Sequence, residues 1–112
     1  MKVAIVGSRD LFVENLEDYV PMETEEIISG GASGVDFCAM RYAHKHRIPL
    51  TEIRPDYRRY KRGAPLKRNL EIIAKADLVL AFWDGSSTGT KFVIDNCIKQ
   101  NVPVEVYRIT GD

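Results

Sequence analysis

The chain has 112 residues, of which 45% are hydrophobic and 29% charged, and its formal net charge at pH 7 is zero. This composition excludes a disordered tail, and no apolar run reaches the roughly 20 residues that a membrane-spanning helix needs. The balanced charge argues against a general polyanion binder. We expect residues 1–112 to form one domain, since a chain of this length can bury one hydrophobic core without help from disulfides or metal ions. We expect a cytoplasmic protein, because a strand-like run follows Met1 and Lys2 with no signal peptide.

Short apolar runs alternate with longer segments of helical periodicity. The pattern predicts a strand over 3–6, a helix over about 11–20 that Pro21 ends, and a strand over 26–29. A second helix begins near Val35 and ends before Pro49, because apolar residues from 35 to 43 share one face. Then follow a strand over 50–54, an irregular basic stretch to about Gly63, and a helix marked by Leu66 with Pro65 near its start. The last three elements are a strand over 78–82, a helix over 90–98 and a strand over 102–109.

The alternation of strands and helices predicts a parallel sheet with right-handed crossovers. Strands one and four are uninterrupted apolar runs, as expected where helices cover both faces. Strand three carries Glu52 and Arg54, and strand five carries Pro103 and Glu105, which belong on sheet edges. We therefore expect an α/β fold: a three-layer Rossmann-like open parallel sheet of five strands, order 3-2-1-4-5, with helices on both faces. The order 2-1-3-4-5 remains an alternative, although it puts strand two at an edge.

Two cysteines and two histidines offer little metal or redox chemistry. Cys38 and Cys97 fall on the apolar sides of predicted helices, so we expect free thiols that pack as small hydrophobes. His44 and His46 are two residues apart on a helix and point in different directions. We predict no metal site and no cofactor.

In such a sheet, ligands bind beyond the carboxyl ends of the strands, where the strand order reverses. Small, hydroxyl and basic residues do follow the strands. After strand one come Gly7, Ser8 and Arg9, which offer a tight turn, a hydroxyl and a forked cation. The alternative, an ordinary turn between strand and helix with an exposed arginine, explains these residues equally well.

Glycine-rich turns follow strands two and four, and each opens a helix. We expect both turns to bring backbone N–H groups to an anionic ligand. In the first, Ser33 and Asp36 also resemble a capping box, so we favour Asp36 as a cap or loop organiser over a catalyst. In the second, Trp83 could stack on a base, but a core-edge or dimer-contact aromatic is the favoured interpretation. The candidate ligand residues in the two turns are Gly30, Gly31, Ala32, Ser33, Gly34, Trp83, Asp84, Ser87, Thr88, Gly89 and Thr90.

Charge is unevenly distributed. Residues 54–68 hold seven basic side chains and one acid, Asp56, whereas residues 14–26 hold six acids and no base. Solvated faces explain most of these charges, but the basic segment could also attract an anionic ligand or single-stranded nucleic acid. Arg68 and Asn69 open the third helix at the same rim, and a cation at a helix N-terminus indicates an anion nearby.

The run from Ile28 to Asp36, with the Gly7-Ser8-Arg9 turn, the Arg68-Asn69 pair and the stretch 82–91, resembles the SLOG superfamily over nearly the whole chain. That group includes DprA and the LOG hydrolases, and the small YspA branch is the most similar. The resemblance implies a Rossmann-like fold and a nucleotide-derived ligand. The LOG motif ends in a glutamate that falls here at Val93, and its Pro-Gly-Gly portion is absent.

Three functions remain open. The first is a binding module or sensor for a small nucleotide-derived phosphate ligand, with Trp83 or Tyr57 beside the base. The second is a nucleoside-monophosphate N-glycosidase, for which the candidate carboxylates are Asp36, Glu71 and Asp84. The third, less favoured, is single-stranded nucleic-acid binding, as the resemblance to DprA implies. We expect no membrane partner, and we expect a homo-oligomer, because aromatics such as Phe92 and Trp83 should be exposed.

Overall fold

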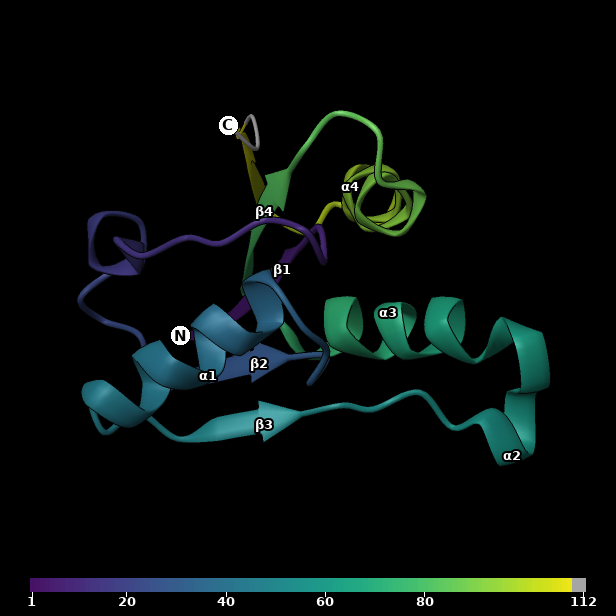
Figure 1. Ribbon diagram of the computed structural model, residues 1–112, viewed down its shortest axis with the longest axis horizontal. Helices are drawn as coiled ribbons and strands as arrows, with labels where there is room; N and C mark the ends of the chain where they lie inside the picture. The colour runs from purple at the N-terminus through teal and green to yellow at the C-terminus, as the bar shows by residue number, and fades with distance from the viewer. Residues whose placement is uncertain (110–112) are drawn as a thin grey trace.

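The computed structural model, which describes residues 1–109, contains one five-stranded parallel sheet of order β3-β2-β1-β4-β5 (Figure 1). The predicted fold class and strand order are confirmed, and the order 2-1-3-4-5 is excluded. The strands are β1 (Lys2–Gly7), β2 (Glu26–Ser29), β3 (Leu50–Glu52), β4 (Leu78–Trp83) and β5 (Val104–Arg108).

Helices cover both faces of the sheet. Helix α1 (Val35–Lys45) packs on one face, while α3 (Ala64–Lys75) and α4 (Thr88–Lys99) pack together on the other. A one-turn helix α2 (Tyr57–Tyr60) and a 3-10 turn η2 (Lys61–Gly63) lie before α3, within the basic stretch that we predicted to be irregular. Cys38 and Cys97 are buried free thiols in separate apolar clusters, one on each face.

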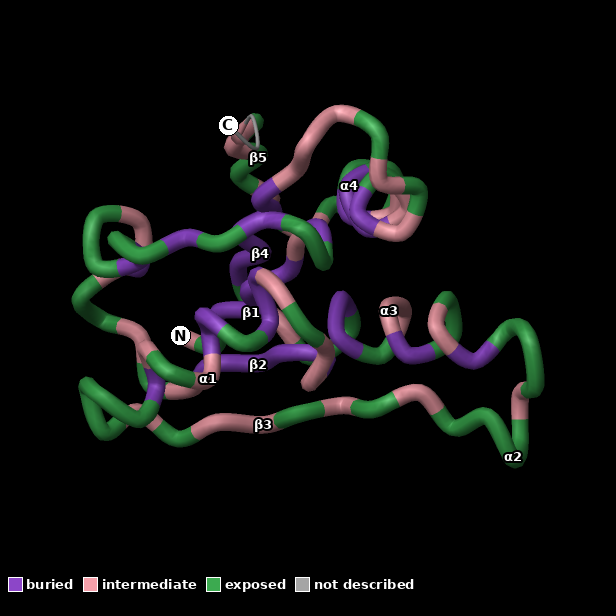
Figure 2. Tube along the Cα trace, viewed as in Figure 1, coloured by how far each residue is buried: buried purple, intermediate pink, exposed green. Residues whose placement is uncertain are grey.

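Burial explains why the order could be predicted from composition. Every residue from Val3 to Val6 in β1 and from Leu78 to Phe82 in β4 is buried, whereas β3 and β5 have no buried residue (Figure 2). The charged side chains of Glu52 and Glu105 therefore stand on the two edge strands, β3 and β5. None of the helices in the described part of the chain is long and apolar enough to cross a membrane.

The predicted helix over 11–20 is wrong. That segment is an irregular chain with a single 3-10 turn, η1 (Leu16–Asp18). Its buried side chains, Leu11, Val13, Leu16 and Val20, pack into the α1-side cluster, but Phe12, which we placed on the helical face, is 54% exposed. The Val13 N–H donates to Cys38 Sγ at 3.3 Å. Contacts with the core therefore determine this segment, and local periodicity does not.

Two further strand boundaries differ from the prediction by two residues. Strand β5 begins after Pro103, which has no N–H to donate to a ladder, so the proline precedes the strand and does not lie inside it. Strand β3 ends at Glu52, two residues early, and the chain then leaves the sheet toward α2.

Candidate functional site

A cleft of about 390 Å³ lies at the carboxyl ends of the strands. It is formed by the turns after β1, β2 and β4, by the first two turns of α4 and by residues of α3. Helix α3 begins at Ala64, so Arg68 and Asn69 lie in its second turn and do not open the helix as we expected. The pairing of Gly7 with Phe82 places the ends of β1 and β4 side by side, and the Ser8 N–H donates to the Phe82 carbonyl at 3.1 Å. The two glycine-rich turns therefore meet at one cleft. Of the predicted residues, those that line it are Gly7, Ser8, Arg9, Gly30, Ala32, Asp36, Arg68, Asn69, Asp84, Ser87, Thr88, Gly89 and Thr90.

Sequence reasoning missed five residues of the cleft wall: Val6, Asp10, Ile72, Ser86 and Val93. Asp10 and Ser86 stand beside predicted residues in the same turns, so their position next to Arg9 and Ser87 in the sequence could have indicated that they line the cleft. Val6, Ile72 and Val93 form apolar parts of the wall, and nothing local distinguishes them from core residues. Val93, the position where the LOG glutamate would fall, is buried.

Four predicted ligand residues do not line the cleft: Gly31, Ser33, Gly34 and Trp83. The Trp83 indole packs with the apolar cluster beneath α3 and α4, and its Nε1 donates to the Ser87 carbonyl at 3.0 Å. Trp83 is thus a core-edge aromatic that is tied to the turn after β4. Glu71 is exposed on α3 and also lies outside the cleft wall.

The turn after β1 contributes one buried hydroxyl and one exposed cation. Ser8 is 3% exposed, and its hydroxyl accepts the Asp84 N–H at 3.3 Å, which ties this turn to the turn after β4. Arg9 is exposed, and its guanidinium has no hydrogen-bond or ion-pair partner within residues 1–109. Its five donors are therefore available to a ligand.

The turn after β2 is organised by Asp36. The Ala32 N–H donates to Asp36 Oδ2 at 3.1 Å, and the Gly31 N–H donates to the Ser29 hydroxyl at 3.3 Å. The expected capping box is wrong, because the cap of α1 is Gly34, with φ 67° and no side-chain cap bond, while Ser33 is exposed. Asp36 thus organises the loop, as predicted.

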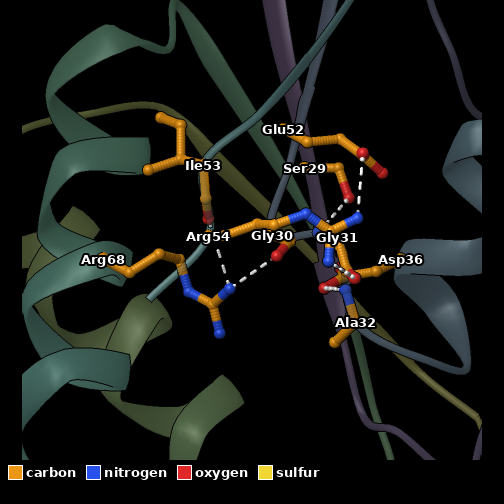
Figure 3. Close-up of polar contacts among 9 residues, drawn as sticks. All are labelled: Ser29, Gly30, Gly31, Ala32, Asp36, Glu52, Ile53, Arg54 and Arg68. Carbon is orange, nitrogen blue, oxygen red and sulfur yellow. Dashed lines mark hydrogen bonds and ion pairs between the residues drawn. The ribbon is translucent and has the colours of Figure 1, made fainter. Parts of the chain in front are cut away.

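Arg68 is buried at the base of the cleft, with 8% of its surface exposed. Its Nη1 donates to the carbonyls of Gly30, at 2.7 Å, and Ile53, at 3.3 Å, and its Nε donates to Asn69 Oδ1 at 2.9 Å. In Figure 3 the remaining nitrogen, Nη2, points away from both carbonyls. Arg68 therefore holds the turn after β2 and keeps one nitrogen for another partner.

Gly30 separates the buried cation from the buried carboxylate. A Cβ at this position would lie 2.5 Å from Arg68 Nη1 and 2.9 Å from Asp36 Oδ2, so a side chain there would push the two apart. Burial raises the pKa of the Asp36 carboxyl, although the Ala32 N–H and the charge of Arg68 act against this shift. Burial likewise lowers the pKa of Arg68, against the raising effect of Asp36.

The raised pKa of Asp36 predicts a pH-dependent stability. The folded state binds this proton more tightly than the unfolded state, so the free energy of unfolding falls as pH rises from the ordinary aspartate pKa to the raised one. We expect Asp36→Asn, which keeps an acceptor for Ala32, to lack this fall. Urea unfolding of both proteins at several pH values checks it: the stability of the variant relative to the wild type should increase through that window. A difference that stays constant with pH contradicts the prediction.

The turn after β4 satisfies several of its own N–H groups. Asp84 Oδ1 accepts from the Ser86 N–H at 2.8 Å and the Ser87 N–H at 2.7 Å, and these bonds lower the pKa of Asp84. The Ser87 hydroxyl caps α4 by accepting from the Thr90 N–H at 3.4 Å. Our expectation that the whole turn offers its amides to a ligand is therefore too broad.

Two amides of this turn that line the cleft remain without an acceptor in residues 1–109. The N–H groups of Thr88 and Gly89, in the first turn of α4, have no acceptor in the described residues, and both residues line the cleft. The same wall carries the guanidinium groups of Arg9 and Arg68, and the carboxylates of Asp10, Asp36 and Asp84. Such a wall can bind an anion at the helix terminus and accept hydrogen bonds from the hydroxyls of the same ligand. Between residues 1 and 109, no group of three or more His, Cys, Asp or Glu side chains is arranged so that it could hold a metal ion.

The homo-oligomer was expected from exposed aromatics, but Trp83 and Phe92 are both half-buried. The exposed aromatic rings are instead those of Phe12, Phe37 and Tyr57. The reason that we gave for an oligomer therefore does not hold.

Comparison with known proteins gives one match to a curated protein. The chain is 33% identical over 84 residues to the Gene 61 protein of Mycobacterium phage D29, and the match covers 70% of this chain and 67% of that protein. No family model and no solved structure matches the chain.

Proposed function

The chain belongs to the same family as the Gene 61 protein of Mycobacterium phage D29, and we propose that it binds a nucleotide or nucleotide-derived phosphate ligand in the cleft. The observation that carries this proposal is the pair of unpaired amides at Thr88 and Gly89, which share a cleft with two arginines. Backbone N–H groups at a helix N-terminus and guanidinium groups are the donors that phosphate oxygens prefer.

The acidic side chains of the cleft favour a ligand with hydroxyl groups in addition to the anion. Three aspartates beside two arginines would repel a bare polyanion, but carboxylate oxygens accept hydrogen bonds from a sugar. A volume of about 390 Å³ suits a small molecule. The resemblance to the SLOG superfamily supports the same ligand class and a role as a ligand sensor.

A binding module is favoured over an N-glycosidase. Val93 stands where the LOG glutamate would fall, so the carboxylate on which that reaction depends is absent at that position. The two candidate carboxylates that line the cleft have structural bonds: Asp36 holds Ala32, and Asp84 holds Ser86 and Ser87. Incubation with AMP, followed by chromatography for free adenine, separates the two functions, since release of adenine would establish the hydrolase instead.

The binding test is a thermal-shift panel with AMP, GMP, ribose 5-phosphate and inorganic phosphate. A ligand at about ten times its Kd should stabilise the fold by about 1.4 kcal/mol. For a domain of this size, that raises Tm by roughly 5 °C or more. A panel in which no compound shifts Tm at millimolar concentration contradicts the proposal.

Arg9→Ala gives the cleanest variant for this test. The Arg9 guanidinium has no partner in the described chain, so its loss should change stability by no more than about 0.5 kcal/mol. We expect the affinity for the panel compound that binds to fall about 10-fold or more, because a charge-assisted hydrogen bond contributes roughly 1.5–3 kcal/mol. Calorimetric titration measures it, and Lys99→Ala, a basic residue at the far end of α4, is the control. Equal affinities for the two variants would remove Arg9 from the site.

A further inference from the structure

A groove of about 530 Å³ lies outside the cleft, along helix α1 from Cys38 to Lys45. Its other side is the irregular segment 12–17, which follows β1 and packs on the same face of the sheet as α1. The groove and the cleft share no lining residue among those described, so the groove is a separate surface. Its floor is apolar and is formed by Val13, Leu16, Cys38, Met40 and Tyr42.

The two rims of the groove carry opposite charges. Glu14 and Glu17 stand on the segment after β1, whereas Arg41 and Lys45 stand on α1, about one helical turn apart. All four residues are exposed, and none of them forms an ion pair within residues 1–109. The two rims therefore do not neutralise each other across the groove, and both remain available to a partner.

A pair of exposed aromatic rings adjoins the groove. Phe12, which lines it, is 54% exposed, and Phe37, in the first turn of α1, is 41% exposed. Their ring centroids are 6.1 Å apart, so the two rings form one apolar patch. Protein interfaces combine an apolar, aromatic-rich centre with a polar rim. The patch, the apolar floor and the charged rims together favour a protein partner over a small ligand.

The charge pattern selects the partner. A purely acidic or purely basic protein would meet one rim of its own sign. A second copy of the chain, turned about a two-fold axis that runs parallel to the groove, presents its acidic rim to the basic rim of the first copy and its basic rim to the acidic one. A two-fold axis across the groove would oppose like charges, so the pattern also selects the orientation of the two copies.

We propose that the chain forms a two-fold symmetric dimer through this groove. Glu14 and Glu17 of each copy face Arg41 and Lys45 of the other, and the Phe12 rings are covered between the copies. This inference goes beyond the proposed ligand of the cleft and does not depend on it. The surface also differs from the one that we expected from the sequence, which rested on aromatic residues that are half-buried.

The test is sedimentation equilibrium over a range of protein concentrations. The mass of the wild type should rise with concentration from 12.7 kDa toward twice that value. Glu14→Lys/Glu17→Lys and Arg41→Glu/Lys45→Glu should each stay monomeric, because like charges then face each other in both halves of the interface. Mixed in equal amounts, the two variants should form a heterodimer, since their reversed rims are complementary again. This recovery would not occur if the groove bound a different protein.

The matched control is Lys75→Glu/Lys99→Glu, which makes the same change in net charge as the α1 variant. It alters exposed residues of α3 and α4, across the sheet from the groove, and should dimerise like the wild type. Phe12→Ala, which keeps every charge, should weaken dimerisation about 10-fold or more, because aromatic residues dominate interface energetics.

Several results would overturn the proposal. A wild type that stays monomeric at millimolar concentration would do so and would leave the groove to another protein. So would reversed variants that have the circular dichroism spectrum of the wild type but do not associate when mixed, a control that is as monomeric as the reversed variants, or a Phe12→Ala protein that dimerises like the wild type. The thermal shift with AMP, measured on the monomeric variants, reports on the cleft alone, so the failure of either proposal can be recognised separately.

Discussion

Gly34→Ala should destabilise the protein by about 3 kcal/mol or more. Gly34 has φ 67° and ψ −123°, a conformation that side-chain-bearing residues adopt at a cost of about 1–3 kcal/mol. A Cβ would also overlap the carbonyl group of Arg9, which is backbone and cannot rotate away. The turns after β1 and β2 touch at this point, so relief of the overlap requires the two turns to move apart.

Urea unfolding of Gly34→Ala measures this loss, and Gly63→Ala is the matched control. Gly63 has φ −80°, and no heavy atom lies within 4 Å of the position that a Cβ would take there, so alanine should be neutral or stabilising by about 0.4–1 kcal/mol. The difference between the two variants therefore isolates the backbone conformation and the Arg9 contact. If both glycines tolerate alanine equally, the contact between the two turns is not what the structure describes.

Arg68→Ala should destabilise the protein by about 2–4 kcal/mol. Removal of the guanidinium leaves the Gly30 carbonyl without its buried donor, at a cost of about 1–3 kcal/mol, and removes a positive charge that favours the ionised form of Asp36. Arg68 is only 8% exposed, so solvent will replace little of what is lost. Arg68→Lys keeps the positive charge, but an ammonium group lacks the planar fork with which the guanidinium reaches two carbonyls and Asn69 at once. We therefore expect its stability to lie between those of the wild type and Arg68→Ala.

Chemical unfolding and calorimetric titration with AMP should be run on both Arg68 variants at a temperature where they are folded. We expect Arg68→Lys to lose affinity as well as stability. Arg58→Ala, which removes an exposed arginine of α2, should change each by no more than about 0.5 kcal/mol. An Arg68→Ala protein as stable as Arg58→Ala would show that the buried guanidinium does not hold the turn after β2.

Several features of the fold follow from composition along the chain. Both central strands are uninterrupted apolar runs, and Glu52 and Glu105 stand on strands that the structure places at the edges. The composition of a strand depends on how many of its faces are covered, so the position of these strands in the sheet can be read from the sequence without the tertiary structure. The meeting of the two glycine-rich turns follows for the same reason, since parallel strands present their carboxyl ends at one edge.

Other features depend on partners that are distant in sequence. The segment 11–20 has helical spacing, but its burial against α1 decides its course. The N–H groups of Ala32, Ser86 and Ser87 are taken by carboxylates, and Trp83 is turned into the core by the Ser87 carbonyl. Local sequence shows that a donor exists but not whether another group already uses it.

The sequence by itself determined the strand order, the end of the sheet that holds the cleft, and most residues of the cleft wall. The number of covered faces decides the composition of each strand, and the shared direction of parallel strands brings their carboxyl ends together. Only the tertiary structure decided which donors remain for a ligand: Thr88, Gly89 and Arg9 are unpaired within residues 1–109, whereas Arg68 is divided between the fold and the cleft. Hydrogen bonding is saturable and directional, so the availability of each group depends on neighbours that only folding brings together.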